Sequence, residues 1–264
     1  QGKPVADIAV FTGDELPRRS VLPDRLEQTL PGIFGREVVE AEQKRLANID
    51  DPLRQIPAGV THSANMADPE NWVNPLRGYA YDSFNPDVLS TATVKDGQVV
   101  FASGTAYKVL VFTGKLSLNP NYEYTSYETV KKLADLIKLG AKVIVGEQPS
   151  LQSGIKQVNS LEFNKIIEEI WGGKFNTKTT KRGNISVKKL GLGLIYKAPF
   201  YGEDFSGLGV ERDVVVTEGT GKAYARYVAF THRKSSEKDI YFVSNQLATD
   251  RLLDFNFRIT NRIP

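Results

Sequence analysis

Two short apolar runs, 109–112 and 143–145, flank a segment with helical spacing of its hydrophobic residues. Both runs are rich in β-branched residues and have glycine nearby, a pattern typical of strands buried on both faces. Between them Val130, Leu133 and Ile137 recur at helical spacing, which predicts an amphipathic helix over 126–139. A strand, a helix and a strand at this spacing predict two parallel strands joined by a right-handed crossover.

The rest of the pattern extends this unit into a larger α/β part. An apolar run over 5–12 predicts a further core strand, and alternation from residue 224 onward predicts antiparallel strands. We therefore expect a parallel sheet with helices on both faces over 1–218, and an antiparallel β segment over 219–264 that begins a following β domain. The other expected elements are helices at 23–30, 37–46 and 161–171, a hairpin at 93–101, strands at 78–83, 185–189 and 193–197, a helical turn at 205–209, a hairpin at 224–245 and a strand at 255–259.

A long segment, 49–85, has little periodicity but holds several aromatic and polar residues, and loops of this length in compact domains are usually functional or disordered. Another polar loop, 14–19, follows the first predicted strand, where α/β sheets form ligand crevices. The alternative is that these side chains cover the domain's own surface. The candidate substrate-lining residues are Asp14, Arg18, Arg19, His62, Trp72, Asn74, Arg77, Tyr81 and Asp82.

Composition removes several classes of function. With 34 basic and 31 acidic residues the net charge is +3, too balanced to indicate nucleic acid as a partner. Cysteine is absent, which excludes a thiolate nucleophile and Cys-ligated metal. The two histidines, His62 and His232, are far apart in the chain, and we expect His232 to be an exposed residue at a strand edge. We expect neither a metal site nor a cofactor.

The sequence also lacks the usual signatures of a phosphate-binding loop and of a glycosidase active site. The stretch 219–223 resembles a phosphate loop, but it has Val216 and Ala223 where that motif needs glycine and Ser or Thr. A glycosidase needs two carboxylates facing each other across the sugar. The sequence offers Asp14, Asp68, Asp82 and Glu147 without indicating that any two converge, so we predict no catalytic residues in this chain.

Several long stretches resemble one family of carbohydrate enzymes. They are GKPVADIAVFTGDELPRR, GVTHSANMADPENWVNPLRGYAYDSFN, TVKDGQVVFASGTAYKVLVF and FTHRKSSEKDIYFVSNQ, and the likeness extends from Gly2 to about Ile259. The chain is similar to the region after the catalytic barrel in large glycoside hydrolases of gut-type bacteria, the α-L-rhamnosidase-like enzymes of glycoside hydrolase family 106.

This resemblance implies a flavodoxin-like domain, related to the class I glutamine amidotransferase fold. It further implies a preceding barrel that carries the catalytic carboxylates, following β-sandwich domains, and export of the parent enzyme to the periplasm or the medium to degrade plant polysaccharide. We expect the chain to be a piece of that longer protein and inactive alone. The alternatives are a free-standing flavodoxin-like domain that binds a flavin or nucleotide, and an amidotransferase-like enzyme, for which the chain lacks a nucleophilic cysteine.

Overall fold

The structure, a computed structural model, describes residues 2–14, 78–112, 114, 122–154, 157–180, 183–197, 205–219, 225, 228–245 and 250–259. The helices predicted at 23–30 and 37–46 lie outside these residues. Six of the predicted site residues also lie outside them, namely Arg18, Arg19, His62, Trp72, Asn74 and Arg77.

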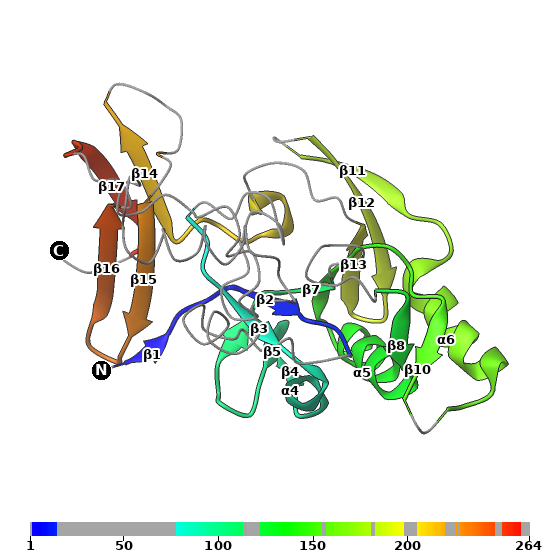
Figure 1. The fold of residues 1–264 in the computed structure, drawn as a ribbon. Helices are drawn as coiled ribbons and strands as arrows, with labels where there is room; N and C mark the ends of the chain where they lie inside the picture. Colours follow the sequence, from blue (N-terminus) through cyan, green and yellow to red (C-terminus); the bar gives the residue numbers. More distant parts are fainter. Residues whose placement is uncertain are drawn as a thin grey trace, which may run out of the picture.

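A seven-stranded mixed sheet forms the centre of the described fold (Figure 1). Its strand order is β11-β12-β13-β9-β7-β2-β3. The five strands from β13 to β3 are mutually parallel, whereas β12 and β11 continue the sheet in antiparallel fashion. The strands are β2 (Ile8–Phe11), β3 (Tyr81–Phe84), β7 (Val109–Phe112), β9 (Lys142–Val145), β11 (Asn176–Thr180), β12 (Gly183–Leu190) and β13 (Gly193–Lys197).

The predicted strand–helix–strand unit is confirmed. Strands β7 and β9 are parallel neighbours, and α5 (Tyr127–Lys138) connects them. Ser126 caps the helix by accepting a hydrogen bond from the Thr129 amide at 3.2 Å. The expected stripe is the buried face of the helix, and β2 and β7 are buried along their whole length.

Among the described residues the two faces of the sheet are covered differently, and the predicted flavodoxin-like fold with helices on both faces is wrong. One face shares a core with α4 (Pro86–Ser90), α5 and α6 (Ser160–Trp171). The other face packs against Tyr79 and a short 3-10 turn, η1 (Ser206–Leu208), with its neighbours Phe205 and Val210. The described residues are mostly strands with three α-helices, and two of the sheet's strands are antiparallel.

The antiparallel extension has a simple covalent cause. Only Gly191 and Leu192 separate β12 from β13, and a two-residue turn joins antiparallel strands, whereas a parallel pair needs a long crossover. Gly191 adopts a φ of 60°, and a Cβ there would lie 2.6 Å from the carbonyl oxygen of Lys138. The turn therefore packs closely on the C-terminal end of α5.

Two small sheets complete this part of the fold. In one, β4 (Thr93–Lys95) and β5 (Gln98–Val100) form the predicted hairpin, with Asp96 and Gly97 at positive φ in the turn, and β6 (Ala106–Tyr107) adds a third strand. The other pairs β8 (Tyr124–Ser126) with β10 (Leu151–Ser153) in parallel.

The remaining strands form what we call the C-terminal β module, made of β1 and β14 to β17. The predicted hairpin is present as β15 (Val228–Lys234) and β16 (Asp239–Asn245), and β1 (Lys3–Pro4) pairs with β15. Strand β17 (Leu253–Phe257) pairs with β14 (Val214–Glu218), and Val214 and Val216 anchor a small separate core. The predicted domain boundary at residue 218 remains a prediction. Strand β14 lies before this boundary and pairs with β17, which lies after it.

Candidate functional site

A pocket of about 790 Å³ opens beside the edge strand β3. Two of the residues predicted to line a site, Tyr81 and Asp82, are on its wall. The described lining residues come from β3, from α4 and its C-cap, and from β6 and the loop before it, and they are Tyr81, Asp82, Ser83, Asp87, Val88, Thr91, Phe101, Ala102, Ser103 and Tyr107.

Local sequence explains how these walls come together. Strand β3 ends at Phe84, and the Asn85 side chain then accepts from the Val88 amide at 3.0 Å, with Pro86 in the first turn of α4. The helix thus begins directly after the strand and places Asp87 and Val88 beside it. Phe84 and Phe101, whose ring centroids are 5.2 Å apart, pack the third wall against the sheet.

The pocket combines a fixed carboxylate with aromatic surface. The Tyr107 hydroxyl donates to Asp82 Oδ2 at 2.8 Å. Burial and the neighbouring Asp82 charge raise the pKa of Tyr107 well above its ordinary value, so the phenol remains a neutral donor. A carboxylate that accepts from hydroxyls, next to rings such as Tyr81 and Phe101, suits a polyhydroxylated ligand such as a sugar.

Asp14 lies elsewhere, at the N-terminal end of α5. Its two carboxylate oxygens accept from the Thr125 hydroxyl at 2.7 Å, the Ser126 amide at 2.8 Å, the Ser126 hydroxyl at 3.1 Å and the Thr129 hydroxyl at 2.6 Å. These contacts hold the start of a helix, where a negative charge is favoured. Tyr81 pairs with Ile8 at the other end of β2, so the structure does not bring Asp14 together with Tyr81 and Asp82.

Glu147 follows β9 and lines a small cavity at the carboxyl ends of the parallel strands. The cavity measures about 30 Å³, and its described lining includes the aromatic residues Phe11, Phe112 and Trp171. The Trp171 indole donates to the carbonyl of Gly146 at 3.1 Å, which fixes one wall. The cavity is the size of one or two water molecules and is too small for a sugar ring.

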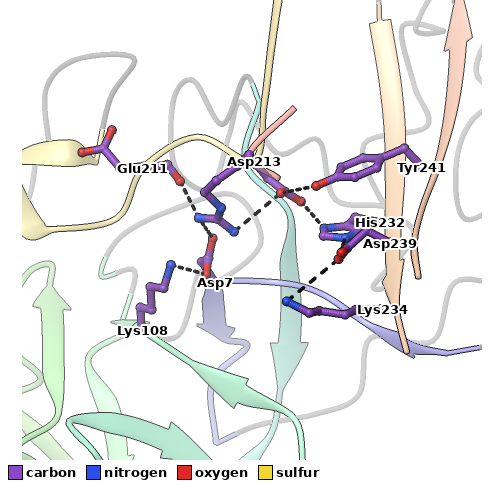
Figure 2. Close-up of polar contacts among 9 residues, drawn as sticks. Asp7, Lys108, Glu211, Asp213, His232, Lys234, Asp239 and Tyr241 are labelled. Atoms are coloured by element: carbon purple, nitrogen blue, oxygen red, sulfur yellow. Dashed lines mark hydrogen bonds and ion pairs between the residues drawn. The ribbon is translucent and has the colours of Figure 1, made fainter. Parts of the chain in front are cut away.

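The structure also shows a buried charged network that we did not predict (Figure 2). His232 is 6% exposed, so its prediction as an exposed edge residue is wrong. Its Nδ1 lies 2.8 Å from Asp213 Oδ2 and its Nε2 lies 3.0 Å from Asp239 Oδ1. The Tyr241 ring stacks on the imidazole at 4.0 Å, and its hydroxyl donates to Asp213 Oδ1.

Arg258 extends this cluster to the central sheet. It contacts Asp7 Oδ2 at 2.6 Å and Asp213 Oδ1 at 3.6 Å, and Lys108 contacts the second oxygen of Asp7 at 3.0 Å. We call Asp7, Asp213, His232, Asp239, Tyr241 and Arg258 the junction network. It connects the start of β2 with the C-terminal β module, and its burial indicates a structural role.

The sequence contained a signal that His232 faces the interior of the protein. Val228, Phe230 and His232 occupy alternate positions of β15, so they share one face of that strand. Val228 and Phe230 pack on the core of the C-terminal β module, which places His232 on the inward face. Its proximity to charged residues in sequence favoured the opposite interpretation.

Within the described residues, no group of His, Cys, Asp and Glu is arranged to hold a metal ion. In the same part of the chain, none of the helices has the length and apolarity that crossing a membrane requires.

Comparison with known proteins places the chain among the glycoside hydrolases. A sequence profile described as alpha-L-rhamnosidase matches residues 58–264. The chain therefore belongs to glycoside hydrolase family 106.

Two relatives show how much of such a protein this chain represents. A protein of Formosa agariphila named "Putative beta-glucuronidase" is 25% identical over 266 residues, which cover 100% of this chain and 16% of that protein. The solved rhamnosidase of Novosphingobium sp. PP1Y has a TM-score of 0.64 at 19% identity, with 98% of this chain and 19% of that chain covered. The chain thus spans less than a fifth of either relative, and it shares the fold of that segment of the rhamnosidase.

Proposed function

We propose that this chain is a non-catalytic accessory domain of a larger, exported glycoside hydrolase, where it packs against the catalytic domain and lines part of its sugar site. The main support is the family match over 58–264 in a chain that spans only 16% and 19% of its two relatives. In family 106, as the sequence resemblance implies, the catalytic carboxylates belong to a barrel that precedes this segment.

The proposed partners follow from the same resemblance. They are a catalytic barrel before this segment, β-sandwich domains after it, and a plant polysaccharide or oligosaccharide as the substrate of the whole enzyme. The relatives bear the names of a rhamnosidase and a glucuronidase, so we propose a glycoside substrate without choosing its sugar.

Within the described residues, the best-supported contribution to a sugar site is the pocket beside β3. Asp82 is held by the neutral phenol of Tyr107, and Tyr81 offers an aromatic surface on the same wall. We keep Arg18, Arg19, His62, Trp72, Asn74 and Arg77 as further candidates for the sugar site. Asp14 lies away from the pocket, and its described contacts support a helix-capping role instead.

The proposal is tested by kinetics of the full-length enzyme with Asp82→Asn, and with Trp72→Ala and Arg77→Ala as further variants. Loss of one hydrogen-bonded or stacked contact should lower kcat/KM by about fivefold to tenfold. Asp135→Asn is the matched control, because Asp135 is exposed on α5 and its substitution removes the same charge as Asp82→Asn. Unchanged kcat/KM in all three variants would remove the site assignment.

The non-catalytic role has a separate test. The purified chain should not hydrolyse an aryl α-L-rhamnoside above the background rate, whereas the full-length enzyme should. Turnover by the chain that disappears when Asp82 or Glu147 is replaced by its amide would show that this segment carries catalytic groups of its own.

A further inference from the structure

A second pocket, of about 490 Å³, lies at the boundary between the central sheet and the C-terminal β module. Its walls are the N-terminal segment 2–7, the loop 104–106 that leads into β6, and the tip of the β15–β16 hairpin at 234–236. The described lining residues are Gly2, Lys3, Pro4, Val5, Ala6, Asp7, Gln98, Gly104, Thr105, Ala106, Lys108, Lys234, Ser235 and Ser236.

The described lining of this pocket has an excess of positive charge. It contains Lys3, Lys108 and Lys234 but one acidic residue, Asp7. The Asp7 carboxylate is already engaged on both oxygens, by Lys108 at 3.0 Å and by Arg258 at 2.6 Å. Arg258 also contacts Asp213 at 3.6 Å, so within the lining Asp7 is the partner of Lys108, and Lys3 and Lys234 are the other two cations.

Lys3 and Lys234 are the cations best placed to meet a ligand. The Lys234 side chain is 59% exposed, and its ammonium is 4.0 Å from Asp239 Oδ1, an oxygen that also faces His232 at 3.0 Å. Lys3 is exposed, and among the described residues no carboxylate lies within 4 Å of its ammonium. Its Nζ lies over Gly104, where a Cβ would be 3.3 Å away.

The junction network holds the walls in place. Asp7, at the start of β2, is tied to Arg258 of the C-terminal β module, and β1 is paired with β15 through Lys3 and Lys234 themselves. The two exposed lysines are thus neighbours across a strand pair. Like charges directly opposite each other on paired strands repel, and an anion bound between them would relieve this repulsion.

From this geometry we infer that the pocket binds the anionic group of a sugar, either the carboxylate of a uronic acid or a sulfate ester. Ammonium groups form strong hydrogen bonds with such oxygens. The volume of about 490 Å³ is far larger than an inorganic anion needs and is sufficient for a sugar ring. Family membership supplies the carbohydrate context, and the inference does not depend on the proposed accessory role.

The test is an NMR titration of the ¹⁵N-labelled chain with four separate probes: D-glucuronate, D-glucose 6-sulfate, D-glucose and inorganic sulfate. We expect one or both anionic sugars to shift the amide signals of Gly104, Thr105 and Ser235, and D-glucose to leave them unchanged. The anionic sugar that binds more tightly identifies the carboxylate or the sulfate as the preferred group. Added salt should weaken binding, because salt ions screen exposed charges with a screening length of about 8 Å at physiological ionic strength.

The matched variants separate this site from general surface charge. Lys3→Gln combined with Lys234→Gln should weaken binding of the anionic sugar by about tenfold. Lys189→Gln combined with Lys165→Gln removes the same charge from exposed positions on β12 and α6 and should leave binding unchanged. The inference is overturned if neither anionic sugar shifts these amides, if the Lys3 and Lys234 variant binds as before, or if inorganic sulfate binds as tightly as the sugars, which would indicate an adventitious ion only.

Discussion

At the scale of single residues, the most consequential side chain is His232. Both of its ring nitrogens face carboxylate oxygens, at 2.8 Å and 3.0 Å, within a cluster that is almost fully shielded from water. Each ring nitrogen thus has its own carboxylate partner, Asp213 or Asp239, and Tyr241 and Arg258 also contact Asp213.

Replacing His232 with alanine should be strongly destabilising. The change leaves two buried carboxylates without their shared partner, which costs about 3 kcal/mol of unfolding free energy. Urea denaturation followed by circular dichroism measures this loss. Thr231→Ala, at the next and exposed position of β15, is the control and should change the midpoint little. Equal midpoints for the two variants would contradict the importance of the buried pair.

The raised pKa of Tyr107 predicts that the protein loses stability at alkaline pH. Burial and the Asp82 charge raise its pKa from 10.0 in the folded state. As pH rises above about 10, the unfolded chain loses this proton while the folded chain retains it, so stability falls with rising pH.

The slope from this one group reaches at most about 1.4 kcal/mol per pH unit. In Tyr107→Phe the decline of unfolding free energy between pH 9.5 and 11.5 should be shallower than in the unmodified chain. Urea denaturation across this range measures both slopes. Tyr124→Phe is the control, since Tyr124 is exposed on β8. Identical slopes in Tyr107→Phe and the unmodified chain would show that the phenol is not protected from ionisation.

At the scale of elements, local sequence patterns were sufficient to predict elements whose structure depends on the residues of one short segment. The stripe of Val130, Leu133 and Ile137 gave α5, and Asp96-Gly97 gave the β4–β5 hairpin. The helical turn predicted at 205–209 is present as η1, but its place on the second sheet face could not be predicted from a local pattern. Among the described residues this segment is placed by contacts with Tyr79, more than a hundred residues away.

Close packing between α5 and β13 gives an element-scale prediction. A Cβ at Gly193 would lie 2.1 Å from the Ile137 carbonyl oxygen and 2.4 Å from that of Ala141, so Gly193→Ala must displace the helix end or the strand. We expect a loss of about 3 kcal/mol or more, as for other overpacked sites. Thermal unfolding measures it.

Gly173→Ala is the control for this substitution. Gly173 has a φ of 70° and nothing within 4 Å of an added Cβ, so it reports the backbone strain alone, about 1 kcal/mol. If Gly193→Ala is no more destabilising than this control, the backbone of α5 does not approach β13 as closely as described.

At the scale of the whole molecule, the junction network joins parts of the chain that sequence patterns treat as separate. Asp7 and Arg258 are 251 positions apart, and Asp213 lies between them in sequence and beside Arg258 in space. No local period relates such residues, which explains why the sequence suggested the β module but not its attachment. The same limit applies to the candidate site, where Asp82 was a candidate from its loop context but its partner Tyr107 and the pocket were found from the structure.

The last prediction concerns this attachment. Arg258 is 26% exposed and contacts Asp7, Asp213 and the Glu211 carbonyl, so it contacts both the central sheet and the β module. In Arg258→Ala the module should open separately, since buried charges without their partner cost about 3 kcal/mol. Native-state hydrogen exchange measured by mass spectrometry should then show amides of β15 and β16 exchanging at lower denaturant than those of β7 and α5. In the unmodified chain we expect these four elements to exchange together.

Arg251→Ala is the matched control, because Arg251 pairs with Glu218 within the module at 2.7 Å and its loss leaves the junction intact. Parallel exchange of all four elements in Arg258→Ala would show that strand pairing between β1 and β15 is sufficient to hold the two parts together.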